Sequence, residues 1–325
     1  MISKENFNLK AAILFVALLF SIFYLDFRFK KLSENNLVND YTSVQTAKSD
    51  DGSLIHSIST KNFDKIIQDW RNRGSKPIIL KIGNSQYHTI NQKVKNQKVV
   101  SEILFNYYQN LGYEYLTISL PNLNFQEALF IYLYFKSLPI EILLLPTFFD
   151  DTRENGIRKN LLEKIRTSDI VLPQDDLTVR KYSQLLIRDE SFVEKVNIQE
   201  FTEKKIDSVF SSILPVWGAR SLLRSDLFYN MYSFRNKVFG IDAKSKRKKL
   251  NAPYSANINA LLSIIKFQKN SNNKILLFIP PIRSDIEIPY IIEEYEDFKN
   301  HIKNICYSED ILFSNLENVV NNDFW

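Results

Sequence analysis

The sequence contains one cysteine and three histidines, too few to form a recognisable metal site. Cys306 has no second cysteine to pair with, so an intrachain disulfide is excluded and the redox compartment stays undetermined. His56, His88 and His301 are far apart, and none has zinc-ligand spacing to another histidine or to Cys306. We therefore expect no metal and no cofactor. The sequence also lacks internal repeats and low-complexity tracts.

A strong net charge is lacking too. The formal net charge is +5 over 325 residues, and no long basic stretch is interleaved with aromatic residues, so a nucleic-acid partner is not indicated. One dense basic run exists, and it consists of Lys244, Lys246, Arg247, Lys248 and Lys249. A solvated loop is its simplest interpretation, and contact with lipid headgroups or an acidic glycan is the alternative.

The sequence does contain enough apolar residues to form a folded core. Apolar residues make up 45% of the chain and charged residues 24%, which is typical of globular proteins. A chain of 325 residues can hold one large α/β domain with an appendage, or two domains.

An unbroken apolar run covers residues 11–25, in which Ser21 is the only mildly polar side chain. The run is shorter than the roughly 20 residues that span a bilayer, but flanking apolar side chains extend it and flanking lysines can reach the interface. No small-x-small cleavage site follows. We therefore predict a retained single-pass membrane anchor within residues 1–31, with the lipid bilayer as a partner. A buried helix is the alternative. Basic residues on both sides leave the orientation open.

Further along, short apolar runs alternate with helix-like segments. Strands are predicted at residues 77–82, 115–120, 140–145, 274–279 and 311–313, and helices at residues 99–111, 125–138 and 291–305. Nearly continuous apolar strands separated by helices indicate a parallel sheet covered on both faces. The predicted fold is a three-layer α/β/α domain at residues 71–325, preceded by a tether and lead-in at residues 32–70.

A mostly helical insertion is predicted to interrupt this domain at about residues 150–270. Its amphipathic segments include residues 160–166 and 258–267. Residues 217–239 are rich in aromatic residues and arginine, which favours core packing or, alternatively, contact with the membrane interface.

The residues Gly83-Asn84-Ser85-Gln86 directly follow the first predicted strand. This position puts Ser85 at the carboxyl edge of the sheet, where open α/β sheets bind ligands. Gly83 lets the chain turn sharply there. The alternative is an ordinary turn in which Asn84 or Ser85 caps the next helix.

Polar segments also follow the next two strands, and with Gly83-Asn84-Ser85 they form a recognisable set. They are SLPNLNFQE at residues 119–127 and DDTRENGIR at residues 150–158, and the tail NLENVVNNDFW occupies residues 315–325. On these motifs the chain resembles the SGNH/GDSL hydrolase superfamily, whose parallel sheet is flavodoxin-like. More narrowly, it is similar to the membrane-anchored SGNH-like proteins that accompany membrane-bound O-acyltransferases in decorating bacterial surface polymers. The resemblance covers roughly residues 70–150 and 270–325.

The resemblance implies a nucleophilic role for Ser85. Its hydroxyl would attack an ester or acyl carbonyl, and its own N–H would help to hold the oxyanion. Asn122 or Asn124 would supply a further amide donor. Turn formation after Pro121 is the alternative role of these two asparagines.

The third motif allows two interpretations. The favoured one is the N-terminus of a helix in which Asp150 and Asp151 are acidic residues of the first turn. The alternative is that Asp150, Asp151 and Arg153 form an ion-paired loop that shapes the pocket beside the serine.

A general base is the part of the family pattern that this sequence does not show. SGNH enzymes carry a histidine in an Asp-x-x-His block after the last strand, and none occurs before Trp325. His88 lies three residues after Ser85 and could share a helical face with it. It is therefore a possible but unfavoured substitute for the missing general base. His301 is expected on a helix surface. Without a base, a serine is a poor nucleophile at neutral pH.

The leading hypothesis is a membrane-anchored SGNH-like protein with its globular part outside the cytoplasm. It would act in O-acyl transfer or ester hydrolysis on a cell-surface polysaccharide, beside a membrane-bound O-acyltransferase, and could be inactive as this chain stands. The alternative is a non-catalytic protein that uses the same cleft to bind glycan or a partner. A cytoplasm-facing α/β protein with an unrelated ligand is a third option. The acyl group, the polymer and the oligomeric state stay unspecified.

Overall fold

The structure is a computed structural model that describes residues 42–44, 46–91, 98–187, 246–282, 285 and 287–320. These residues all belong to one compact unit of the chain, made of residues 40–188 and 245–325. The predicted anchor at residues 11–25 and the aromatic segment at residues 217–239 lie outside the described residues. Within the described part, no helix is long and apolar enough to cross a membrane.

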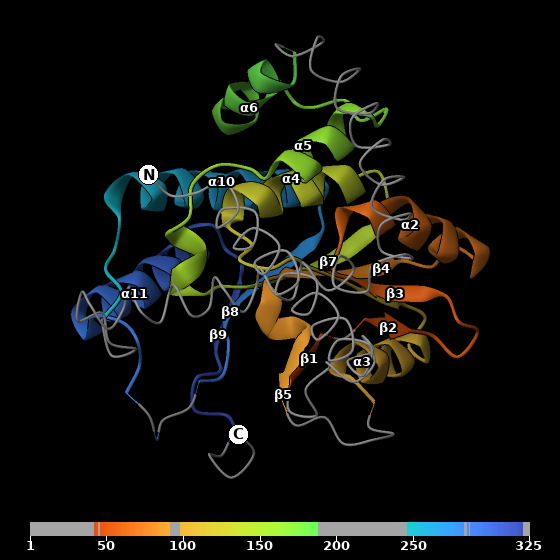
Figure 1. The fold of residues 1–325 in the computed structure, drawn as a ribbon, viewed down its shortest axis with the longest axis horizontal. Helices are drawn as coiled ribbons and strands as arrows, with labels where there is room; N and C mark the ends of the chain where they lie inside the picture. Colours follow the sequence, from red (N-terminus) through yellow and green to blue (C-terminus); the bar gives the residue numbers. More distant parts are fainter. Residues whose placement is uncertain are drawn as a thin grey trace, which may run out of the picture. The chain divides into compact units, whose positions relative to one another are not determined.

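A seven-stranded, mostly parallel sheet organises this unit, with the strand order β2-β3-β6-β4-β7-β8-β9 (Figure 1). Of these strands, β2 pairs antiparallel with β3 and the others pair in parallel. The strands are β2 (Ala47–Lys48), β3 (Leu54–Ser57), β4 (Ile78–Gly83), β6 (Glu114–Ser119), β7 (Ile140–Pro146), β8 (Lys274–Ile279) and β9 (Leu312–Asn315). A separate antiparallel pair joins β1 (Thr42–Val44) to β5 (Thr89–Asn91).

The central strands β4 and β6 are buried along their whole length, because helices cover the sheet on both sides. The chain leaves β4 through α3 to reach β6 on one side, and it leaves β6 through α4 to reach β7 on the other side of β4. The strand order therefore reverses around β4. In open α/β sheets, such a switch point opens a crevice at the carboxyl ends of the strands.

Helices lie on both faces of the sheet, with α2, α4 and α10 on one face and α3 on the other (Figure 1). Apolar α4 is buried throughout, because it is sandwiched between the sheet and α10 and α5. The helices are α2 (Phe63–Asn72), α3 (Val100–Gln109), α4 (Phe125–Phe135), α5 (Lys159–Arg166), α6 (Leu177–Ile187), α10 (Asn251–Asn270) and α11 (Ile292–Ser308).

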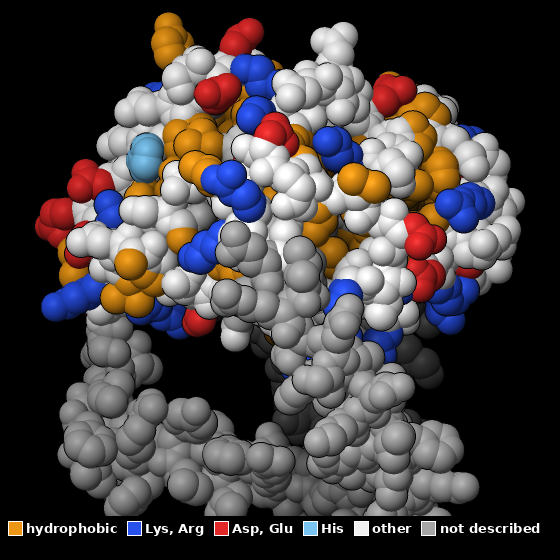
Figure 2. All heavy atoms as spheres, turned by 90° about the horizontal axis from the view of Figure 1, so that it is seen from above, with side chains coloured by type: hydrophobic (Ala, Val, Ile, Leu, Met, Phe, Trp, Pro, Cys, Tyr) orange, Lys and Arg blue, Asp and Glu red, His pale blue; other side chains and the backbone are white. Residues whose placement is uncertain are grey.

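The outer face over α5, α6 and α10 shows basic, acidic and apolar side chains interspersed (Figure 2). A surface of mixed sign does not create the extended potential that attracts a polyanion. This face therefore gives no indication of a polyanionic ligand (Figure 2).

The structure confirms an α/β fold with a mostly parallel sheet, and the predicted strands and helices lie within a few residues of the observed ones. Two differences concern the boundaries. The lead-in at residues 32–70 contains β2, β3 and most of α2, and four-residue β3 is too short to give a pattern in the sequence. The predicted insertion contains α10, which instead covers the sheet as the crossover between β7 and β8.

Candidate functional site

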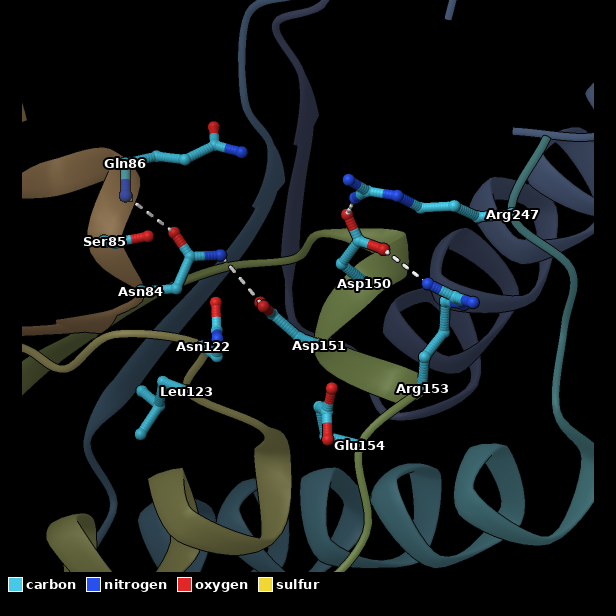
Figure 3. A pocket seen from close by; sticks show the side chains of 10 residues that line it. All are labelled: Asn84, Ser85, Gln86, Asn122, Leu123, Asp150, Asp151, Arg153, Glu154 and Arg247. Atoms are coloured by element: carbon cyan, nitrogen blue, oxygen red, sulfur yellow. Dashed lines mark hydrogen bonds and ion pairs between the residues drawn. The ribbon is translucent and has the colours of Figure 1, made fainter. Parts of the chain in front are cut away.

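A pocket of about 420 Å³ lies at the carboxyl ends of β4, β6 and β7, where the strand order reverses (Figure 3). Residues from all three sequence motifs line it, together with an arginine from the basic run. The lining residues are Asn84, Ser85, Gln86, Asn122, Leu123, Asp150, Asp151, Arg153, Glu154 and Arg247. The lining is mostly polar, with three amide side chains, three carboxyl groups, two guanidinium groups and one hydroxyl. Such a set suits a ligand rich in hydroxyl groups or carbonyl oxygens.

Ser85 begins a short 3-10 helix, Ser85–Tyr87, directly after β4. Its side chain is half-buried, and its hydroxyl points into the pocket (Figure 3). Gly83 makes this turn possible, because a Cβ there would lie 2.6 Å from Cδ2 of Tyr87 and 3.1 Å from Cγ of Pro146. The Tyr87 ring therefore occupies the space that any larger residue at position 83 would need.

Asn84 and Asp151 join the first motif to the third across the floor of the pocket. The Asn84 amide donates a hydrogen bond of 2.9 Å to Oδ1 of Asp151 and accepts one of 3.0 Å from the N–H of Gln86. Both Asn84 and Asp151 are buried. Burial raises the pKa of the Asp151 carboxyl well above its ordinary value, and the hydrogen bond from Asn84 opposes this rise.

The two candidate amide donors of the second motif have different roles. Asn122 lines the pocket and has a φ of 49°, the left-handed conformation that asparagine tolerates in turns. Asn124 is buried and caps α4: it accepts from the N–H of Glu127 at 2.9 Å and donates to the Gly156 carbonyl at 3.0 Å. Because its amide group is engaged, Asn124 is not positioned as a pocket donor, whereas Asn122 is.

A buried ion pair joins the second and third motifs. Glu127 accepts from Nε and Nη2 of Arg158, at 2.6 Å each, and from the Arg158 N–H at 2.9 Å. Arg158 also donates to the carbonyl of Pro121 at 2.8 Å. The Glu127 side chain is 4% exposed, so this two-pronged pair is largely removed from water. It fixes the two loops that form opposite walls of the pocket.

Asp150 binds the two arginine side chains that line the pocket. Its carboxylate pairs with Arg153 at 3.3 Å and with Arg247, and it accepts a hydrogen bond of 3.1 Å from the Tyr290 hydroxyl. Arg153 also donates to the carbonyl of Lys248 at 3.0 Å. Asp150 and Asp151 thus lie in the first turn of the 3-10 helix Phe149–Thr152, as the favoured interpretation has it, and Asp150 also pairs with Arg153, whereas Asp151 accepts from Asn84.

Arg247 was not anticipated as a lining residue. It lies in the basic run, 97 residues after Asp150, and its side chain reaches over the pocket (Figure 3). The signal in the sequence was only the density of positive charge, which does not distinguish a solvated loop from a binding loop.

The imidazole nearest to Ser85 in the sequence points elsewhere. His88 Nδ1 lies 2.8 Å from the Ser119 hydroxyl, and both side chains are buried. In the part of the chain that is described, no hydrogen bond links His88 to the Ser85 hydroxyl. Burial also lowers the pKa of His88. The predicted shared helical face thus does not bring the ring to the serine.

Ser119 is instead the centre of a buried polar network on the α3 side of the sheet. Its hydroxyl also lies 2.6 Å from Nε2 of His56, whose Nδ1 lies 3.1 Å from the hydroxyl of Ser101 on α3. Ser101 donates a 3.3 Å hydrogen bond to Thr117. One serine hydroxyl can donate to only one of the two rings and must accept from the other.

Through His88 this network fixes the end of the turn that contains Ser85, while the bond between Asn84 and Asp151 fixes its beginning. Burial, and then the nearby positive charges of His88 and Lys81, lower the pKa of His56 to about 3. Burial also lowers the pKa of Lys81 to about 7, and its Nζ lies 3.3 Å from the centre of the Tyr87 ring. The buried groups that contact the Ser85 turn are therefore uncharged or only partly charged. No pattern in the sequence predicted that they lie together.

No family model matches the chain, and neither the curated proteins nor the solved structures include a match to it. The described residues also contain no cluster of histidine, cysteine, aspartate or glutamate that could hold a metal ion.

Proposed function

We propose that the protein is a membrane-anchored SGNH-like protein that acts in O-acyl transfer or ester hydrolysis on a cell-surface polysaccharide, beside a membrane-bound O-acyltransferase. The observation that carries the proposal is the meeting of three motif loops around Ser85 in one polar pocket at the switch point of a parallel sheet. The motifs are far apart in the sequence, so their convergence supports a shared task.

The chemistry follows from the lining groups. The Ser85 oxygen would attack the acyl carbon and form an ester with it, the bond between that carbon and the leaving oxygen would break, and the serine proton would pass to the leaving oxygen. A glycan hydroxyl or water would then take the acyl group from Ser85. The amide of Asn122 lines the same pocket, where it can donate to the oxyanion. Amide, carboxyl and guanidinium groups around the pocket can bind sugar hydroxyls.

One observation favours the alternative of glycan binding without catalysis. Within the described residues, no imidazole lines the pocket, and His88 is bonded to Ser119. A serine that lacks a base loses the acid–base contribution, which is typically about 10²–10⁴-fold in rate. We accordingly expect this 325-residue chain to react slowly with a fluorophosphonate probe and with p-nitrophenyl acetate.

The test compares labelling of the unaltered chain with Ser85→Ala, His88→Ala and the exposed control Ser308→Ala. Fast labelling that only Ser85→Ala abolishes would establish a nucleophile and reveal a base that the described residues do not show. Fast labelling lost in both Ser85→Ala and His88→Ala would make His88 the base. Labelling that Ser85→Ala leaves unchanged would refute the assignment of Ser85.

The membrane anchor is tested separately. The apolar run at residues 11–25 should keep the full chain in the membrane fraction during alkaline carbonate washing, and a chain that begins near Asn35 should be soluble. Protease digestion of spheroplasts should reach the globular part if it faces outward. Release of the full chain by carbonate would contradict a spanning helix.

A further inference from the structure

The exposed side of α3 is unusually apolar for a surface helix. Eleven large apolar side chains of the described residues are exposed, and four of them lie on α3 or directly after it. These four are Val100 (61% exposed), Ile103 (53%), Tyr107 (60%) and Leu111 (57%), and we call them the α3 stripe. The other seven are scattered over the chain, as is usual for soluble surfaces.

Three of the four side chains share one side of the helix. At about 100° and 1.5 Å per residue, Val100, Ile103 and Tyr107 fall within an arc of about 60° and span about 11 Å along the helix, and Leu111 follows in the turn after it. The opposite side of α3 buries Ser101 and Phe105 against the sheet. The one charged residue of the helix, Glu102, turns back to accept from the N–H of Val99 at 3.2 Å. The stripe is therefore uncharged, and sheet packing does not use it.

The stripe lies where the N-terminal chain enters the described unit. That chain forms β1 and then β2, and β2 packs directly against α3. Sixteen residues, 26–41, separate the apolar run from β1. A chain of this length reaches at most about 55 Å when it is fully extended. The N-terminal chain therefore enters the described unit on the side that carries α3.

We propose that the α3 stripe rests on the lipid bilayer that holds the N-terminal anchor, an inference that rests on the anchor of the proposed function. An uncharged stripe of aliphatic side chains with a central tyrosine suits the membrane interface, where the tyrosine ring is partly buried and its hydroxyl stays hydrated. Because α3 packs along the sheet, the bilayer would lie beside the sheet. The pocket at the strand ends would then open along the membrane surface, towards membrane-bound partners.

The test uses the full chain in lipid nanodiscs. Ile103→Cys carries an environment-sensitive fluorophore in a Cys306→Ser background, and some lipids carry a spin-label quencher at the headgroup. The matched control is Tyr307→Cys, an exposed aromatic position on α11 with 91% exposure. We expect loss of emission at position 103 and none at position 307. Adding Tyr107→Glu should restore the emission at position 103, because it places a charge within the stripe.

Each other outcome overturns the proposal. Equal quenching at positions 103 and 307, or quenching at neither, means that α3 does not face the bilayer. The emission at position 103 could also be independent of the quencher and change with the number of chains per nanodisc. This result would mean that a second copy of the chain covers the stripe. A chain that fails to enter nanodiscs refutes the anchor itself, whereas an inserted chain without quenching refutes only the role of α3.

Discussion

The buried network under the Ser85 turn predicts a specific form of acid instability. His56 is 1% exposed, and its pKa lies at about 3 in the folded chain, against 6.5 for the free side chain. Below pH 6.5 the unfolded chain therefore binds a proton at His56 that the folded chain does not bind. Stability from this group is complete above pH 6.5 and is lost as the pH falls towards 3.

The magnitude follows from the same two values. Each pKa unit corresponds to about 1.4 kcal/mol, so the free energy of unfolding should fall by up to about 1.4 kcal/mol per pH unit in this window. Between pH 6.5 and 4 the loss from His56 is about 3 kcal/mol. This is a large part of the roughly 5–15 kcal/mol that stabilises a typical domain.

Replacing His56 by glutamine removes the titration and keeps an amide that can bond to Ser119. His56→Gln should cost about 1–2 kcal/mol at pH 7.5, because the network is disturbed. At pH 4 its free energy of unfolding should approach or exceed that of the unaltered chain. Urea denaturation between pH 7.5 and 4 measures both curves, and Ser308→Ala, at an exposed position without a titrating side chain, is the control. Parallel curves for His56→Gln and the unaltered chain would refute the reasoning.

Two further predictions concern the walls and floor of the pocket. Glu127→Gln should lower the free energy of unfolding by about 1.5–3 kcal/mol, because it removes the charge of a buried carboxylate that accepts two hydrogen bonds from the half-buried Arg158 side chain. The control Glu163→Gln, at an exposed pair, should change it by less than about 0.5 kcal/mol. Equal effects in urea denaturation would contradict the role of the pair. Gly83→Ala should cost about 1–3 kcal/mol through the clash with Tyr87, and adding Tyr87→Ala should cancel part of that clash. Simple additivity in this double-mutant cycle would show that the tyrosine ring is not what requires glycine.

Local patterns in the sequence were sufficient to locate most of the sheet. Apolar runs at residues 77–82 and 274–279 predicted β4 and β8. In β4 every residue is buried, so the strand is apolar almost throughout, whereas in β8 only alternate residues are buried. The position of Ser85 at the carboxyl edge then follows, because it comes directly after β4. The ion-paired loop at Asp150 and Arg153 is local too, since the two residues are three apart.

The sequence did not separate the roles of similar residues. Asn122 and Asn124 both follow Pro121, and either could have been the pocket donor. The backbone decides between them: Asn122 takes a left-handed turn and lines the pocket, while Asn124 begins α4 and uses its side chain to cap it. Capping depends on where the helix begins to within one residue, and sequence patterns do not reach that precision.

Contacts between distant segments came only from the tertiary structure. His56 meets Ser119 across 63 positions, and Arg247 meets Asp150 across 97. Both contacts depend on which strands and loops are neighbours, which the order of residues along the chain does not state. The sequence by itself located five strands of the seven-stranded sheet and placed a serine at the end of one of them, because burial and turning are local requirements. The tertiary structure decided which groups surround that serine, because parallel strands bring remote segments to one edge.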